Sequence, residues 1–191
     1  MVGEALAAGS GELGRLVRES INSWGVEIVG FGDVREGLPW ELAHLPLAIA
    51  LAVPHPPLEQ CLIEKNGVLM YQSHHPEVDA VLEAVQGKLV KLLRSLGFRY
   101  LAIPPDSQRI SSRFVAKLYP LFPHKTAATC AGLGWIGKSG LLINPTYGPR
   151  LSWATVLTNA PIQPAKDWAT RGACGSCRRC IQACPASAIS G

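Results

Sequence analysis

The sequence predicts an α+β fold with layered helices and strands, followed by a short cysteine-rich segment. Of its 191 residues, 48% are hydrophobic and 17% are charged, a composition that supplies a core and excludes a disordered chain. Helical and strand-like patterns alternate over residues 1–160, an order typical of a layered α/β domain. Near the C-terminus, four of the six cysteines lie within eleven residues. We therefore expect a cofactor or substrate domain at 1–160 and a segment of a different kind at 161–191.

Hydrophobic periodicity places the helices and strands of the first part. Residues 10–24 and 78–96 carry hydrophobic side chains at helical spacing, and Gly97 stands where the second helix would end. The near-continuous apolar run at 47–53 is typical of a strand buried on both faces. Further strands are expected at 26–31, 100–103, 140–144 and 151–158, and a further helix at 124–133.

Charge and hydropathy limit the function classes. Eighteen basic and fourteen acidic residues give a net charge of +4, too small on its own to indicate a nucleic-acid-binding protein. The strongest apolar stretch, residues 45–54, is far shorter than the roughly 20 residues of a membrane span, and the N-terminus lacks the pattern of a secretory signal. We therefore expect a cytoplasmic protein without a membrane partner, whose thiols stay reduced and serve metal or redox chemistry.

The cysteine-rich segment has the spacing of an iron–sulfur site. Its pattern is C-x2-C-x2-C-x3-C-P, which is the run found in bacterial ferredoxins. Three closely spaced thiolates can wrap one [4Fe–4S] cluster, while the last cysteine is expected to begin a helix and reach another iron. The predicted metal ligands are Cys174, Cys177, Cys180 and Cys184, followed by Pro185.

Zinc coordination and disulfide bonding fit this cysteine spacing less well. A zinc site usually has two separated pairs, and disulfides between such close neighbours would be strained. In two-cluster ferredoxins the fourth cysteine ligates the second cluster, yet only Cys61 and Cys130 remain elsewhere in the sequence, and both are expected in the core. Either one cluster uses all four cysteines, or a remote cysteine contributes, or the chain is a piece of a longer protein.

The glycine-rich run AGLGWIGKSG at 131–140 is a second candidate site. Its glycines permit close approach of the backbone to a flat or anionic ligand, and Lys138 could meet a phosphate or propionamide group. Trp135 could stack on a ligand or lie in the core. His124 could be a ligand or general acid, or simply a helix-start residue bonded locally, whereas His74 and His75 are expected to face solvent.

Several motifs together resemble the epoxyqueuosine reductase family and its small iron–sulfur relatives. The resemblance covers about residues 120–190. It is carried by HKT at 124–126, AGLGWIGKS at 131–139, LINPTYG at 142–148, ATVLT at 154–158 and CGSC at 174–177.

The resemblance implies a nitroreductase-like, cobalamin-binding α/β domain joined to a ferredoxin-like domain, a plan shared with reductive dehalogenases. Electrons would pass from a [4Fe–4S] cluster to a corrinoid, which would reduce a modified tRNA nucleoside or another small substrate. An electron donor of the ferredoxin or flavodoxin type is implied as a partner, and 161–191 would be part of a ferredoxin-like segment. The expected cofactor-binding residues are His124, Gly134, Gly137, Lys138, Ser139 and Tyr147.

The family also places a catalytic aspartate before the long helix, where this sequence matches loosely. Glu77 or Asp79 could take that place. Both could equally be helix-capping charges, because acidic residues are favoured in the first turn. The sequence therefore favours an iron–sulfur oxidoreductase. The alternatives are a non-catalytic electron-transfer module that serves a partner protein and, more weakly, a nucleic-acid-binding module.

Overall fold

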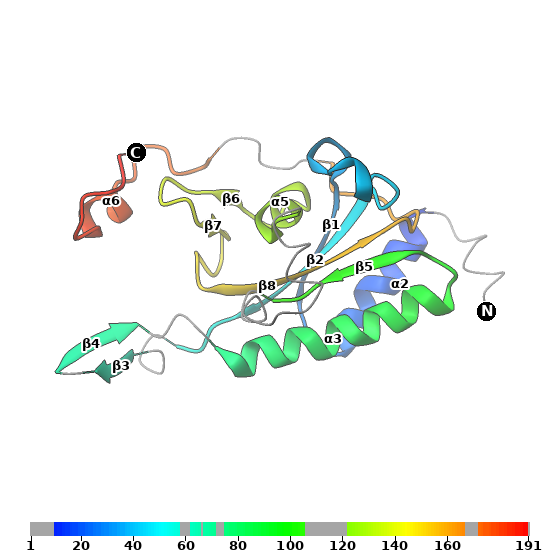
Figure 1. Ribbon diagram of the computed structural model, residues 1–191, viewed down its shortest axis with the longest axis horizontal. Helices are drawn as coiled ribbons and strands as arrows, with labels where there is room; N and C mark the ends of the chain where they lie inside the picture. Colours follow the sequence, from blue (N-terminus) through cyan, green and yellow to red (C-terminus); the bar gives the residue numbers. More distant parts are fainter. Residues whose placement is uncertain are drawn as a thin grey trace.

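The computed structural model describes residues 10–57, 62–65, 67–71, 75–105, 122–166 and 172–190. Its centre is a four-stranded antiparallel sheet with the order β1-β2-β8-β5 (Figure 1). The strands are β1 (Ile28–Asp33), β2 (Leu47–Pro54), β5 (Tyr100–Ile103) and β8 (Leu151–Thr158). The α+β fold class predicted from the sequence is confirmed.

Strand β2 is the most deeply buried part of the sheet, as its apolar run predicts. Residues 48–52 are 0% exposed, because β2 lies between β1 and β8 and both faces of the sheet are covered. The register pairs Ala50 with Thr155 and Leu47 with Thr158. Small alanines in β2 alternate with Ile49 and Leu51, so one face can receive a helix at close range.

Two long helices cover one face of the sheet and a short helix covers the other (Figure 1). The first face carries α2 (Ser10–Ser23) and α3 (Pro76–Ser95), and the opposite face carries α5 (His124–Cys130). Helix α3 begins two residues earlier than its periodicity suggests, since Pro76 occupies the first turn, where its missing N–H costs nothing. Gly97 has φ +82° and ends this helix as expected.

Helix α5 lies almost directly on β1 because two glycines in that strand leave space for its C-terminal end. A Cβ on Gly30 would lie 2.9 Å from the Ala131 carbonyl oxygen, and one on Gly32 would lie 2.6 Å from the Cys130 carbonyl carbon. The helix ends at Cys130, three residues before its expected end, since Gly132 turns the chain with φ +70°.

Two small hairpins stand outside the main sheet. Strands β3 (Leu62–Lys65) and β4 (Val68–Tyr71) form an arm that extends away from the domain (Figure 1). The second hairpin pairs β6 (Trp135–Ile136) with β7 (Leu142–Ile143). The strand expected at 140–144 is therefore only two residues long, and it pairs within the glycine-rich run instead of joining the sheet.

The chain returns across the domain before it reaches the cysteines. Ala165 donates a backbone hydrogen bond to the Phe31 carbonyl of β1, 2.8 Å long. The short helix α6 (Arg179–Ala183) lies beyond the β6–β7 hairpin and apart from the sheet (Figure 1). None of the helices in the described ranges is long and apolar enough to cross a membrane.

We predict that Gly32→Ala destabilises the fold, because its Cβ would meet the α5 backbone. The expected loss in free energy of unfolding is about 1–3 kcal/mol, as for other overpacked sites. Gly87→Ala is the matched control: Gly87 is exposed on α3 with nothing within 4 Å of the added atom. The control should gain about 0.5–1 kcal/mol from helix propensity. Equal stability of the two variants in urea unfolding would contradict this packing.

Candidate iron–sulfur site

The four cysteines of the C-terminal segment lie on one turn and one short helix. Cys177 donates its backbone N–H to the Cys174 carbonyl, 2.9 Å away, so the first two cysteines share a tight turn. Cys180 lies within α6, and Cys184 is the residue that ends it. Cys177 is exposed, the other three are half-buried, and all four are free thiols. The prediction that a helix begins at Cys184 is wrong, because α6 ends at this residue instead. Since α6 is short, the residues after Cys184 can fold back toward the cysteine.

The Cys174 sulfur lies against the β6–β7 hairpin. A Cβ on Gly137 would stand 3.6 Å from this sulfur, so the absent side chain allows the close approach. The Trp135 indole N–H, followed by the backbone N–H of Lys138, lowers the pKa of the Cys174 thiol. The Trp135 Nε1 atom is buried and has no well-formed hydrogen bond to any described residue. The indole N–H thus favours the thiolate of Cys174 without forming a well-aligned hydrogen bond to it. It can therefore donate to a stronger acceptor at this position.

The Cys184 sulfur accepts a backbone N–H from the turn that follows it. Ala188 donates its N–H to this sulfur at 3.4 Å. The backbone N–H of Ala188, with those of Ala186, Ile189 and Ser187, lowers the pKa of the Cys184 thiol. Ser187 has φ +49°, and a left-handed residue within such a turn lets successive N–H groups converge on one anion, as in anion-binding nests.

These features fit an anionic thiolate-ligated group. Thiolates are the ligands of iron–sulfur clusters, and N–H donors at Cys174 and Cys184 favour the charged form of both sulfurs. Within the described part of the chain, no three His, Cys, Asp or Glu side chains are yet gathered as metal ligands. Binding of a cluster therefore requires the sulfurs to move together, and an exposed segment with little packing can make that movement.

The glycines of the 131–140 run serve the hairpin itself. A Cβ on Gly134 would overlap the Ile143 carbonyl group, and one on Gly137 would lie 2.8 Å from Ile143 Cγ1. The remaining residues expected to bind a cofactor, Lys138, Ser139 and Tyr147, are at least partly exposed on the same hairpin and the loop after it.

Asn144 is a residue of this region that sequence reasoning missed. Its amide donates to the Leu133 carbonyl at 2.8 Å, and its side-chain oxygen accepts the N–H groups of Thr146 and Tyr147. This Asx turn holds the loop that carries Tyr147. An Asn directly before Pro-Thr is a recognised turn signal and could have indicated it.

His124 is built into a buried polar network. Its Nε2 lies 2.9 Å from the Pro104 carbonyl and its Nδ1 lies 2.8 Å from the Thr155 hydroxyl. Because a carbonyl only accepts, Nε2 carries a proton, and in the neutral ring Nδ1 accepts from the Thr155 hydroxyl. Gln86 of α3 adds bonds to the carbonyls of Ile103 and Thr155, each 2.8 Å long. Both ring nitrogens of His124 are thus engaged, which agrees with a locally bonded helix-start residue.

The two candidate acids lie at the start of α3. Asp79 is 6% exposed, while Glu77 is exposed and lies 3.4 Å from Nδ1 of His75. His75 is 3% exposed, so the expectation that it faces solvent is wrong, and its ring centroid lies 4.3 Å from that of His55. Burial, followed by the charge of His75, lowers the pKa of His55. His74 and Cys61 lie outside the described residues.

Two pockets open elsewhere on the described surface. One of about 430 Å³ is lined by residues of 33–37 with Thr126 and Cys130, and another of about 400 Å³ lies at the start of α2. Neither is lined by any residue predicted for the site. Cys130 is half-buried and burial raises the pKa of its thiol, so it differs chemically from Cys174 and Cys184.

Comparison with known proteins identifies relatives of the chain. No family model matches it. An epoxyqueuosine reductase of a Synechocystis species is 38% identical over 101 residues, which are 53% of this chain and 33% of that protein. The structure of epoxyqueuosine reductase from Streptococcus thermophilus is similar with a TM-score of 0.69 and 22% identity, over 93% of this chain and 53% of that one.

A catabolic reductive dehalogenase shares the same fold. Its structure is similar with a TM-score of 0.71 and 18% identity, over 96% of this chain and 26% of the dehalogenase chain. The chain thus spans about a third of the curated reductase and about half of the solved one.

Proposed function

This chain is similar to the epoxyqueuosine reductases, and on that premise we propose that it is an iron–sulfur oxidoreductase. A [4Fe–4S] cluster held by Cys174, Cys177, Cys180 and Cys184 would pass electrons to a corrinoid or substrate on the α/β domain. The observation that carries this proposal is the geometry at two of the four sulfurs: Ala188 donates its N–H to the Cys184 sulfur at 3.4 Å, and the Cys174 sulfur lies against Gly137 of the hairpin. Neutral N–H groups aimed at sulfur favour thiolate and stabilise a net negative cluster.

The residues around the sulfurs would each contribute N–H groups that stabilise a bound cluster. The cluster supplies one-electron redox chemistry when bound. The N–H groups of Trp135 and Lys138 would act on the domain side of Cys174, and Ala188 donates its N–H to Cys184 on the outer side. Hydrogen bonds to cluster sulfurs are one of the factors that set the reduction potential. Trp135 would therefore link the cluster to the hairpin that faces the domain.

We place the corrinoid or substrate against the same hairpin. Lys138, Ser139 and Tyr147 present partly exposed polar groups there, while Gly134 and Gly137 keep the backbone tight. Residues 1–160 would form the domain that binds it and 161–191 the iron–sulfur segment. The substrate would be a modified tRNA nucleoside or another small molecule, with Glu77 or Asp79 at the start of α3 as the acid.

The alternative is a non-catalytic electron-transfer module that serves a partner protein. The exposed position of Cys177 suits either proposal. The layered domain favours the enzyme, since a cluster binding loop alone does not need a four-stranded sheet with helices on both faces.

We predict that anaerobic reconstitution loads about four iron and four sulfide ions per chain. Reduction should then produce the EPR signal of a [4Fe–4S]⁺ cluster. Cys174→Ser should lose most of the iron, because it removes the thiolate held by Trp135 and Lys138. Cys130→Ser is the matched control and should load fully, since Cys130 lies on α5. Stoichiometric zinc without labile sulfide in the wild-type protein would refute the cluster.

Corrinoid binding separates the enzyme from the electron-transfer module. Cobalamin added to the loaded protein should change its absorption spectrum and co-elute with the chain on gel filtration. Lys138→Ala should weaken this binding, whereas Lys88→Ala on α3 should not, because Lys88 lies over Trp24 on the opposite face of the sheet. An unchanged spectrum without co-elution would favour the electron-transfer module.

A further inference from the structure

Charge is distributed very unevenly along this chain. Residues 122–190 contain seven Lys and Arg and only one acidic residue, Asp167, a net charge of +6. Residues 1–121 contain eleven basic and thirteen acidic residues, a net charge of −2. The modest overall charge therefore conceals a basic C-terminal third. Such asymmetry between two parts of a chain indicates a charged partner for one of them.

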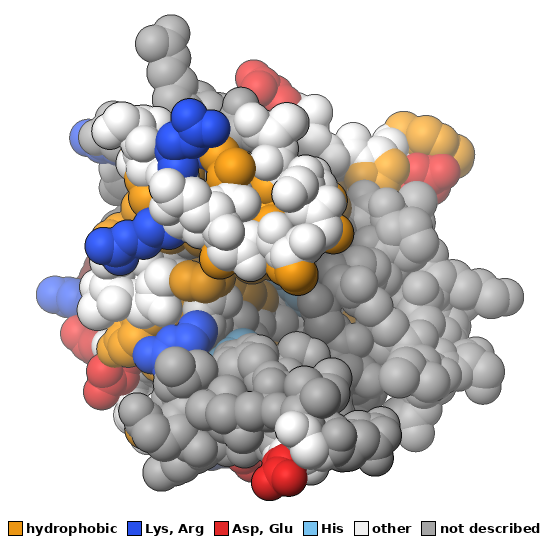
Figure 2. Space-filling model, turned by 90° about the vertical axis from the view of Figure 1, so that its left-hand side faces the viewer, with side chains coloured by type: hydrophobic (Ala, Val, Ile, Leu, Met, Phe, Trp, Pro, Cys, Tyr) orange, Lys and Arg blue, Asp and Glu red, His pale blue; other side chains and the backbone are white. Residues whose placement is uncertain are grey.

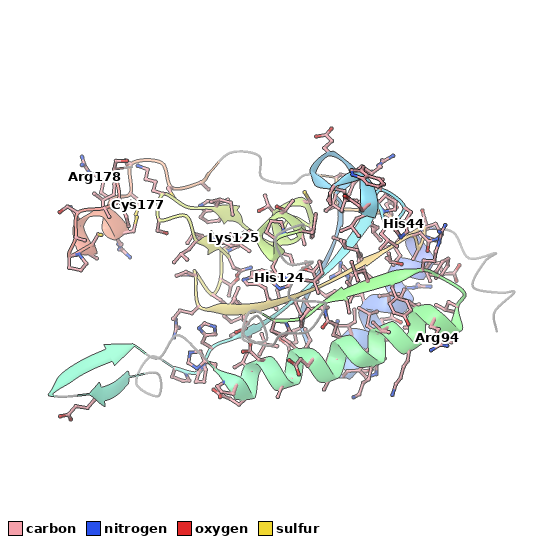
Figure 3. The ribbon with its side chains drawn as sticks, viewed as in Figure 1. His44, Arg94, His124, Lys125, Cys177 and Arg178 are labelled. Carbon is pink, nitrogen blue, oxygen red and sulfur yellow. The ribbon has the colours of Figure 1, made fainter. Side chains whose placement is uncertain are left out.

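The basic side chains nearest the cysteines are exposed. Arg178 and Arg179 directly follow the exposed Cys177, and all three face solvent. Lys138 is exposed on the β6–β7 hairpin, and its backbone N–H lies at Cys174. Figure 3 places Cys177 and Arg178 together at one end of the molecule, far from Arg94. None of these three cations forms an ion pair with a side chain in the described ranges.

Exposed aliphatic side chains lie on the same hairpin as one of these cations, Lys138. Ile136 is 43% and Leu141 48% exposed, and both belong to the hairpin that carries Lys138. The face seen in Figure 2 shows Lys and Arg side chains next to hydrophobic ones, with acidic side chains toward the edges of the view. A small basic and aliphatic surface is suited to a transient protein contact, for which interfaces under about 1,200 Å² are usual.

We propose that this basic surface, formed by Lys138, Arg178, Arg179, Ile136 and Leu141, docks a small acidic electron-carrier protein. The inference rests on the proposed function and names the partner of the same site. One electron would leave the reduced carrier and enter the cluster near Cys177, oxidising the carrier, with no bond made or broken. The cations offset the negative charge of the thiolates, which would otherwise repel an acidic carrier, and they steer its approach.

The test compares two double charge reversals that change the net charge equally. Arg178→Glu/Arg179→Glu alters the surface, and Lys91→Glu/Arg94→Glu alters two exposed cations of α3. Stopped-flow spectroscopy would measure reduction of the loaded chain by an acidic flavodoxin. Each rate is divided by the rate of reduction by photoreduced deazaflavin, a small reductant that needs no docking surface. A change in the reduction potential of the cluster affects both rates, so it cancels in the ratio. At low salt the first variant should be slower by at least about tenfold, an effect that shrinks at 0.5 M salt.

The outcomes separate this proposal from the proposed function. Equal normalised rates for the two variants would overturn the docking surface while leaving the cluster intact. Calorimetric titration of flavodoxin into the chain as purified gives a readout that does not need the cluster. Binding that weakens only in Arg178→Glu/Arg179→Glu supports docking even where little iron is loaded. Loss of tRNA stem-loop binding in that variant, with unchanged flavodoxin binding, would assign the surface to RNA and overturn the proposal.

Discussion

The contact between Cys174 and the β6–β7 hairpin joins the exposed cysteine segment to the folded domain. It depends on Gly137, which leaves room for the sulfur, and on the N–H groups of Trp135 and Lys138. The hairpin is in turn held by the close approach of Gly134 to β7 and by the Asn144 turn. These contacts connect the buried sheet to a segment that has no buried residues of its own in its described part.

The contacts that support the β6–β7 hairpin begin in the centre of the sheet. Helix α5 leads into the hairpin and can lie close to β1 only because Gly30 and Gly32 have no side chains. His124 fixes the start of α5 to Thr155 of β8, and Gln86 connects α3 to the same residue. A buried, fully bonded polar network of this kind specifies one arrangement of its helices. The hairpin is thus supported by closely packed, buried elements, whereas the cysteine segment next to it has no buried residues in its described part.

Much of the fold can be predicted from periodicity, and the site only in part. The buried run of β2 and the long stripe of α3 are local patterns, so both follow from the sequence, as does the end of α3 at Gly97. The hairpin of β6 and β7 does not, because two-residue strands leave no periodic signal. His75 has polar sequence neighbours that suggest exposure, yet its burial depends on contact with His55, twenty residues earlier. The cysteine spacing indicates the candidate ligands, whereas the N–H groups around their sulfurs depend on backbone conformation, which residue types alone do not specify.

The most direct test of a cluster seated on the β6–β7 hairpin is the reduction potential of the loaded protein with Trp135→Phe. Phenylalanine keeps an aromatic ring in the hairpin but removes the N–H that acts on Cys174. Redox titration followed by EPR should give the same iron content and a lower midpoint potential than in the wild type, because the reduced cluster loses a donor that stabilises its extra negative charge. Identical potentials in the two proteins would contradict this position of the cluster.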